Sequence, residues 1–170
     1  MIIVLGGVSG AGKSTIGRLL ATELDWRFID ADDFHPQANI DKMRAGIALN
    51  DEDRTPWLDR LAAELQALVQ QGQCAILACS ALKQAYRDRL GVDGKLVVSV
   101  QLVGHIDVLT ARLAARQHAF MSRHLLQSQL ATLEADPGLA VDIDQSPVAV
   151  VQQIITELRL PPLSAVPPDQ

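Results

Sequence analysis

The sequence has few features of a secreted or membrane-bound protein. Its two cysteines, Cys74 and Cys79, lie in one apolar stretch, where an extended chain would hold them too far apart for a disulfide. We expect both to be buried thiols. The apolar residues 1–5 have no basic flank and are too short for a signal peptide or a membrane span. We therefore expect a cytoplasmic protein with no membrane partner.

Clusters of basic residues are also missing. The chain has 15 Lys and Arg against 20 Asp and Glu, a formal net charge of -5. A nucleic-acid surface needs clustered positive charge, so we expect no nucleic-acid partner. The sequence has no internal repeat and no linker, and 48% of its 170 residues are hydrophobic. This composition predicts one domain at residues 1–160, followed by a flexible, proline-rich tail at 161–170.

Short apolar runs alternate with longer helical patterns along the chain. This alternation is typical of β-α units around a parallel sheet that is covered on both faces. The predicted strands lie at residues 2–5, 26–30, 74–79, 96–103 and 140–143. The clearest predicted helix runs from Pro56 to Gln70, with Thr55 as its cap. The last predicted helix begins at Pro147, with Ser146 as its cap.

A glycine-rich segment follows the first predicted strand and precedes a helical pattern. Residues 7–14 read Gly-Val-Ser-Gly-Ala-Gly-Lys-Ser, which satisfies the phosphate-loop pattern G-x-x-x-x-G-K-[ST]. The backbone N–H groups of such a loop point at phosphates, Lys13 would neutralise the β- and γ-phosphates, and the Ser14 hydroxyl would bind Mg²⁺. We therefore predict ATP and Mg²⁺ as ligands of an α/β, three-layer αβα P-loop NTPase fold with a parallel five-stranded sheet and a small lid. The ATP-binding residues predicted in this loop are Gly7, Val8, Ser9, Gly10, Ala11, Gly12, Lys13, Ser14 and Thr15.

The phosphate loop alone does not distinguish among nucleotide-binding proteins. The simpler interpretation, a glycine-rich turn with a solvated lysine, disagrees with the strand before it and the helix after it. The guanine-binding pattern N-K-x-D is absent, because residues 39–42 have the order Asn-Ile-Asp-Lys. A long apolar strand that ends in Asp-Glu, typical of motor ATPases, is also missing. The rest of the site must therefore decide the class.

Three acids, Asp30, Asp32 and Asp33, follow the second predicted strand. Ligands of open α/β sheets bind outside the carboxyl ends of the strands, so these acids should face the nucleotide. One carboxylate would hold Mg²⁺, and we assign Asp30 to this role together with Ser14. An extended segment would place Asp30 and Asp32 on one face, so Asp32 is the predicted base for an attacking hydroxyl. The alternative is that these acids serve a loop or a helix cap.

At this point the sequence resembles gluconokinases, over nearly the whole chain from residue 2 to about residue 158. The resemblance rests on seven segments of the sequence. They are Phe-Ile-Asp-Ala-Asp-Asp-Phe-His-Pro at 28–36, Asn-Ile-Asp-Lys-Met at 39–43, Leu-Asn-Asp-Glu-Asp-Arg at 49–54, Pro-Trp-Leu at 56–58, Cys-Ser-Ala-Leu-Lys at 79–83, Tyr-Arg-Asp at 86–88 and Leu-Leu-Gln-Ser-Gln-Leu-Ala-Thr-Leu-Glu at 125–134. The resemblance implies ATP-dependent phosphorylation of the terminal hydroxyl of D-gluconate, and it allows a homodimer.

Basic residues in these segments define the expected substrate site. Arg54 would grip a carboxylate through two parallel hydrogen bonds, which suits a sugar acid. Lys83 and Arg87, four residues apart on a predicted helix, would present one positive face to the same ligand. The alternatives are a solvated basic helix face and, for the acids before Arg54, a favourable place at a helix N-terminus. The predicted substrate-binding residues are Asp32, His35, Arg54, Ser80, Lys83 and Arg87.

A lid is predicted after the fourth strand. Arg112 and Arg116 lie four residues apart on a predicted helix, and the resemblance implies that the first packs on adenine and the second reaches the phosphates. Residues 117–124 would close over ATP and exclude water. Here Ala119 separates a His-Phe pair that is contiguous in related sequences. Residues 141–145 are expected to contact adenine through their backbone.

The predicted catalytic residues are Lys13, Asp32 and Arg116. Lys13, Arg116 and Mg²⁺ would stabilise the transferring phosphoryl group, while Asp32 orients or deprotonates the hydroxyl. Two alternatives stay open. One is a kinase for another small hydroxy acid such as shikimate, which the same phosphate loop and acids would serve. The other is a nucleotide-binding regulator without catalysis, for which the altered lid is the hint.

Overall fold

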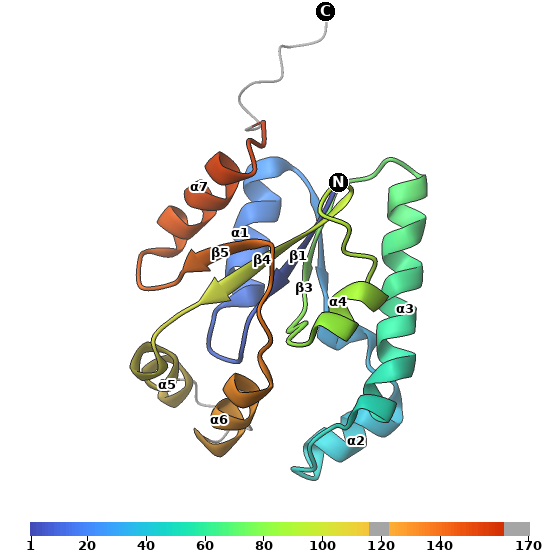
Figure 1. Cartoon of the computed structure of the whole chain (residues 1–170), viewed down its shortest axis with the longest axis vertical. Helices are drawn as coiled ribbons and strands as arrows, with labels where there is room; N and C mark the ends of the chain where they lie inside the picture. Colours follow the sequence, from blue (N-terminus) through green and yellow to red (C-terminus); the bar gives the residue numbers. More distant parts are fainter. Residues whose placement is uncertain (116–122, 162–170) are drawn as a thin grey trace, which may run out of the picture.

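The computed structural model describes residues 1–115 and 123–161, with residues 123–125 described by their backbone alone. Five parallel strands form one sheet. They are β1 (Ile2–Gly6), β2 (Arg27–Asp30), β3 (Ala75–Ala78), β4 (Val97–Val103) and β5 (Leu139–Asp142). The order across the sheet is β2-β3-β1-β4-β5, with helices on both faces (Figure 1). The predicted three-layer α/β fold and its five parallel strands are confirmed.

The helices cover the sheet and the edge where its strands end. They are α1 (Lys13–Leu24), the short 3-10 helix η1 (Ala31–Phe34), α2 (Gln37–Arg44), α3 (Asp51–Gln70), α4 (Gln84–Arg89), α5 (Ile106–Ala114), α6 (Arg123–Thr132) and α7 (Pro147–Glu157). In Figure 1, α1 and α7 lie on one face of the sheet, and α3 and α4 lie on the other. Helices α2, α5 and α6 lie beyond the carboxyl ends of the strands, in the lower part of that view.

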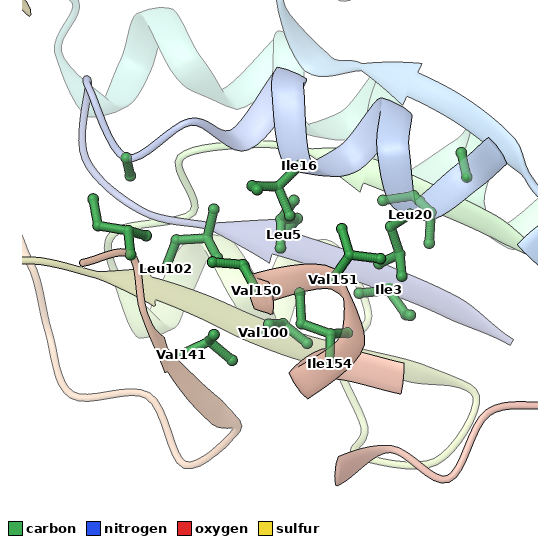
Figure 2. Close-up of a cluster of buried hydrophobic side chains, with 14 of the residues drawn as sticks. Ile3, Leu5, Ile16, Leu20, Val100, Leu102, Val141, Val150, Val151 and Ile154 are labelled. Carbon is green, nitrogen blue, oxygen red and sulfur yellow. The ribbon is translucent and has the colours of Figure 1, made fainter. Parts of the chain in front are cut away.

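Strand β1 shows how the sequence builds two cores. Successive side chains of a strand point to opposite faces of the sheet. Ile3 and Leu5 join the cluster that packs against α1 and α7, whereas Ile2 and Val4 join the cluster that packs against α3. Because β1 is central and buried on both sides, it is apolar throughout. Figure 2 labels members of the first cluster: Ile3, Leu5, Ile16, Leu20, Val100, Leu102, Val141, Val150, Val151 and Ile154.

The strand order brings three chain segments to one edge of the sheet. Strand β3 pairs with both β1 and β2, and the register places Leu5, Ala78 and Asp30 side by side. The segments that follow these residues therefore leave the sheet at the same edge. They carry the glycine-rich loop, the residues from Cys79 to Lys83, and the three acids. The site expected from separate parts of the sequence is thus concentrated at the carboxyl ends of neighbouring strands.

Helix α3 begins at Asp51, five residues before the predicted start at Pro56. The side chain of Asn50 accepts a hydrogen bond from the Asp53 backbone N–H at 2.8 Å, and the Asp53 carboxylate accepts from the Asn50 N–H at 3.0 Å. This reciprocal capping box satisfies two donors at the helix start, so Thr55 is not the cap. Three acids consequently occupy the first turn, where the helix dipole favours negative charge. Helix α7 begins as predicted, with Ser146 as cap and Pro147 in its first turn.

Both cysteines are free thiols. Cys79 is buried as predicted, and burial raises the pKa of its thiol to about 12. Cys74 is only partly buried, so the expectation of two buried thiols is correct for one of them. Within residues 1–115 and 123–161, none of the helices has both the length and the apolar character needed to cross a membrane.

Candidate active site

The glycine-rich loop turns tightly between β1 and α1. Gly10 and Gly12 have φ values of 85° and 90°, in the left-handed region that residues with a Cβ rarely adopt. A Cβ on Gly7, whose φ is 138°, would lie 2.8 Å from the Leu102 carbonyl oxygen. These glycines are therefore required by the backbone path. Helix α1 begins at Lys13 directly after Gly12, so the positive end of its dipole adjoins the loop.

Two side chains of the phosphate loop take up defined positions. The Lys13 ammonium donates to the carbonyl oxygens of Gly7 and Val8, at 2.9 and 3.1 Å. The Ser14 hydroxyl donates to one carboxylate oxygen of Asp30 at 2.9 Å. Ser14 and Asp30 thus bring a hydroxyl and a carboxylate together at the start of α1. Hard oxygen donors of this kind fit Mg²⁺, which commonly takes one or two protein ligands and completes its shell with phosphate oxygens and water.

The acids after β2 are held by a 3-10 turn rather than by an extended segment. Asp30 caps η1, and its second carboxylate oxygen accepts the Asp32 backbone N–H at 3.2 Å. The prediction that an extended segment places Asp30 and Asp32 on one face is therefore wrong. The two residues are adjacent because of the 3-10 turn. Asp33 is exposed in the same turn.

The pKa of Asp32 is raised above its usual value. The side chain is open to solvent, yet the surrounding walls of the cleft reduce the hydration of its carboxylate, and the negative charge of Asp30 acts in the same direction. The positive charge of Lys13, and that of His35 when its ring is protonated, oppose the shift. A carboxylate with a raised pKa is a better proton acceptor, which is the property that a general base needs.

His35 forms one wall beside Asp32. Its ring stacks on Trp57 with centroids 4.3 Å apart, and its Nδ1 lies 3.3 Å from the Asn39 side-chain nitrogen. Because Asn39 donates there, the proton of the neutral ring belongs on Nε2, which lies 3.9 Å from the Asp32 carboxylate. Burial lowers the pKa of His35, and the charge of Arg54 adds to this effect, so the ring is neutral near pH 7. The His35 ring therefore adjoins the Asp32 side chain.

An open pocket of about 580 Å³ lies beside the phosphate loop. Three parts of the chain line it: the start of α3 and the loop before it, the segment from β3 to α4, and one side of α6. The lining residues are Ala48, Leu49, Asn50, Asp51, Glu52, Arg54, Ser80, Leu82, Lys83, Tyr86, Ser128, Gln129 and Thr132. Three of the predicted substrate-binding residues, Arg54, Ser80 and Lys83, are therefore brought together in one cavity.

The charges in this pocket form a network around Asp51. Both oxygens of the Asp51 carboxylate accept from the Lys83 ammonium, at 2.9 and 2.7 Å, and one accepts from the Tyr86 hydroxyl. The Arg54 guanidinium lies 3.3 Å from the Tyr86 hydroxyl and 3.9 Å from the Asp51 carboxylate. Hydrogen bonds from Lys83 and Tyr86 lower the pKa of Asp51. The pocket thus offers two cations, two carboxylates (Asp51 and Glu52) and a phenol, a set that suits an acid with several hydroxyl groups.

Sequence reasoning missed Asp51, Tyr86 and Gln129 as pocket residues. Asp51 lies in the same segment as Arg54, and the sequence favours its carboxylate only as a negative charge at a helix N-terminus. That explanation is correct for its position but incomplete, because the carboxylate also binds Lys83 across 32 residues of sequence. Tyr86 and Gln129 stand in segments that carry the family resemblance, but the resemblance gave neither residue a role. The contact of Gln129 with the phosphate loop joins residues 120 positions apart, which no local pattern signals.

Arg87 does not belong to the predicted positive face. Helix α4 begins at Gln84, and Lys83 is its cap with an extended backbone, so the four-residue helical spacing does not apply to this pair. The Arg87 side chain points into the protein and is 0% exposed. It donates to the carbonyl oxygens of Ala81, Leu82 and Ala135 and to the side chain of Gln84, at 2.7 to 3.3 Å. The expectation that Arg87 contacts the substrate is wrong.

Arg87 instead holds the loop that carries two pocket residues. Ala81 has a φ of 42°, an uncommon value for a residue with a Cβ, and its carbonyl accepts from the Arg87 guanidinium. The same guanidinium lies 3.6 Å from the buried carboxylate of Asp136. Ser80 and Lys83 flank this strained turn, so Arg87 supports their positions from behind.

The opposite side of the phosphate loop has a small second cavity. Ala11 and Ile16 from the loop and α1 face Ile143, Gln145 and Val150 there, and Arg112 lies at its rim. The Arg112 guanidinium donates to the Ile143 carbonyl oxygen at 2.7 Å. This arrangement joins Arg112 to the predicted adenine-binding segment 141–145. Arg116 and most of the predicted lid at 117–124 lie outside the described residues, and α6 begins at Arg123.

Comparisons with known proteins agree with this architecture. The family described as "Shikimate kinase" matches residues 9–158 of the chain. The chain is 42% identical to a gluconokinase from Arabidopsis thaliana over 170 residues, which covers 91% of this chain and 90% of that protein.

Two solved structures are similar along most of their length. The crystal structure of a sugar kinase from Janibacter sp. HTCC2649 has a TM-score of 0.86 and 42% identity, and 98% of each chain is covered. The crystal structure of a gluconokinase from Sinorhizobium meliloti 1021 has a TM-score of 0.80 and 40% identity, with 92% of this chain and 90% of that chain covered.

Proposed function

Because this chain belongs to the gluconokinase family of P-loop kinases, we propose that it transfers the γ-phosphoryl group of ATP to the terminal hydroxyl of D-gluconate. The products are ADP and 6-phospho-D-gluconate. The observation that carries the proposal is the position of Arg54 and Lys83 in a pocket that adjoins the phosphate loop. Two cations in the lining of one pocket suit a sugar acid better than a neutral sugar.

The phosphate loop would supply binding and charge neutralisation. Its backbone N–H groups and the N-terminus of α1 would bind the β- and γ-phosphates. Lys13 would move from the Gly7 and Val8 carbonyls to the transferring phosphoryl group, whose charge is spread over its peripheral oxygens. Ser14 and Asp30 would hold Mg²⁺, which when bound neutralises the phosphates. Arg116 is proposed to add a second positive charge from the lid side.

Asp32 would accept the proton of the acceptor hydroxyl. The acceptor oxygen forms a bond to the γ-phosphorus while the bond from that phosphorus to the bridging oxygen of ADP breaks. The hydroxyl proton passes to the Asp32 carboxylate. The raised pKa of Asp32 favours this step, and the hydrogen bond that the Asp32 backbone N–H donates to the Asp30 carboxylate would keep the base close to the proposed magnesium ligands.

ADP release with a panel of acceptors tests the function. D-gluconate, shikimate and sorbitol are compared at saturating ATP and Mg²⁺, because sorbitol matches gluconate in its hydroxyl chain but lacks the carboxylate. We expect kcat/KM to be highest for gluconate and at least about tenfold lower for sorbitol, from the loss of a charge-assisted hydrogen bond. The Lys13→Met variant sets the background.

The panel also separates the alternatives. The match to the family described as "Shikimate kinase" is the observation that favours shikimate as a second candidate acceptor. A higher kcat/KM for shikimate would replace gluconate with that acid. ATP binding without ADP release for any acceptor would favour a regulator. The cytoplasmic location, the homodimer and the single domain at 1–160 remain predictions.

A further inference from the structure

Gln129 contacts the phosphate loop and also lines the acceptor pocket. It lies on α6, and its side-chain oxygen Oε1 accepts a hydrogen bond of 2.7 Å from the backbone N–H of Ser9 in the phosphate loop. The same residue lines the 580 Å³ pocket together with Ser128 and Thr132. A single carboxamide therefore lies at the junction where an acceptor hydroxyl would have to meet the terminal phosphate.

The hydrogen bond to Ser9 satisfies a donor of the phosphate loop. Backbone N–H groups of such loops bind anionic oxygens, and a charged acceptor forms a stronger hydrogen bond than a neutral carboxamide. The Gln129 oxygen is thus a neutral stand-in for a phosphate oxygen at this amide. A terminal phosphate that binds Ser9 must displace it.

The backbone of α6 is anchored, so displacement has to come from rotation of the Gln129 side chain. Leu126 is 0% exposed in the main core, and Leu130 and Leu133 pack against the same core. The segment after α6 is tied to the pocket, because the Glu134 N–H donates to the Leu82 carbonyl oxygen at 2.9 Å. A glutamine has three side-chain torsions, and the open pocket is the space beside it.

We propose that Gln129 is a positioning residue that holds the Ser9 amide in the empty enzyme and releases it to the terminal phosphate of ATP. The freed carboxamide then turns into the pocket and hydrogen-bonds the hydroxyl groups of the acceptor. Nucleotide and acceptor consequently bind with positive coupling, and the coupling is reciprocal. The choice of gluconate as the acceptor rests on the function proposed above, whereas the contact with Ser9 does not.

Three variants test this role by titration with a non-hydrolysable ATP analogue and Mg²⁺, each with and without gluconate. Gln129→Met removes the competing oxygen but keeps the side-chain length. It should bind the analogue roughly two- to tenfold more tightly in the absence of gluconate, the range expected for one neutral hydrogen bond. Gln129→Glu keeps an oxygen for Ser9 and adds a negative charge, so it should bind the analogue more weakly than wild type.

Gln127→Met is the matched control, because Gln127 is exposed on the same helix. It should keep the wild-type affinity for the analogue and the wild-type coupling. In Gln129→Met, the ratio of the gluconate affinities measured with and without the analogue should fall toward one. KM for gluconate should rise. Thermal unfolding verifies that all three variants are folded.

Opposite shifts of the Met and Glu variants support the proposal, since a merely structural role would weaken binding in both. Unchanged or weaker analogue binding by Gln129→Met, or unchanged coupling in it, overturns the proposal. Turnover of gluconate by the wild-type protein is measured in the same preparation. Its absence counts against the proposed acceptor, and the analogue titrations without gluconate still test the contact with Ser9.

Discussion

The two halves of the cleft are built in different ways. The phosphate-binding half uses one continuous segment, residues 7–15, in which glycines shape the backbone path and α1 begins at Lys13. The acceptor half combines side chains from the start of α3, the segment from β3 to α4, and α6. A local motif therefore describes the first half, whereas the second exists only after folding. Substitutions should affect the two halves in correspondingly different ways.

Lys13→Met should produce the largest effect, a loss of kcat without a loss of stability. Loss of the ammonium removes charge stabilisation of the transferring group, so we expect kcat to fall about 10³-fold or more. The midpoint of thermal unfolding should stay close to that of the wild type, because Lys13 lies at the mouth of the loop and not in a core. Steady-state kinetics and a melting curve check both statements, and wild-type turnover would refute the assignment.

Asp32→Asn should lower kcat by about 10²- to 10⁴-fold, with a smaller change in KM for the acceptor, if Asp32 accepts the proton. The pH profile provides a second readout. Because the pKa of Asp32 is raised, the wild-type base becomes protonated at a higher pH than an ordinary aspartate as the pH falls. The acid limb of kcat should therefore begin at higher pH than usual and should disappear in the Asn variant. A variant that loses only substrate affinity would exclude this role.

Arg87→Met tests the support behind the acceptor half. Removal of the buried guanidinium leaves three carbonyl oxygens without this donor and the Asp136 carboxylate without its ion-pair partner, so we expect the free energy of unfolding to fall by about 3 kcal/mol or more. Arg89→Met is the matched control on the same helix, since Arg89 forms an exposed ion pair with Asp59 and should contribute about 1 kcal/mol or less. Denaturant unfolding distinguishes the two variants. Equal losses would contradict the structural role of Arg87.

Arg54→Met should have the smallest of these effects, and only KM for the acceptor should change. Loss of a charge-assisted contact predicts an increase in KM for gluconate of about ten- to a hundredfold, with KM for ATP almost unchanged. Arg60 is exposed on the same helix, and Arg60→Met serves as its control. If KM for ATP rises as much as KM for gluconate, the division of the cleft into two halves is incorrect.

The sequence patterns were most reliable where the chemistry is local. Apolar runs located the five strands, and the glycine-rich pattern located the phosphate loop with Lys13 and Ser14. They were less reliable at the start of α3, where the capping box of Asn50 and Asp53 outweighed the signal of Thr55 and Pro56. Capping depends on reciprocal side-chain geometry, which a single favourable residue type does not reveal.

Arg87 shows the limit of spacing arguments. Arg87 lies four residues after Lys83, but α4 begins only after Lys83. The Lys83 side chain lines the pocket, whereas the Arg87 side chain is buried. The resemblance located the right segment, and only the fold distinguished the residue that lines the pocket from the residue buried behind it. Asp51 and Gln129 were missed because their partners lie far away along the chain.

The sequence by itself determined the parallel sheet and the phosphate loop, because strand periodicity and the backbone requirements of glycine act between near neighbours. The tertiary structure decided the composition of the acceptor pocket. Its residues meet because β3 lies between β1 and β2, so that segments distant in the chain leave the sheet at one edge. It also decided which cations line that pocket, since burial requires the charge of Arg87 to be satisfied inside the protein, whereas Arg54 and Lys83 face the pocket beside Asp51.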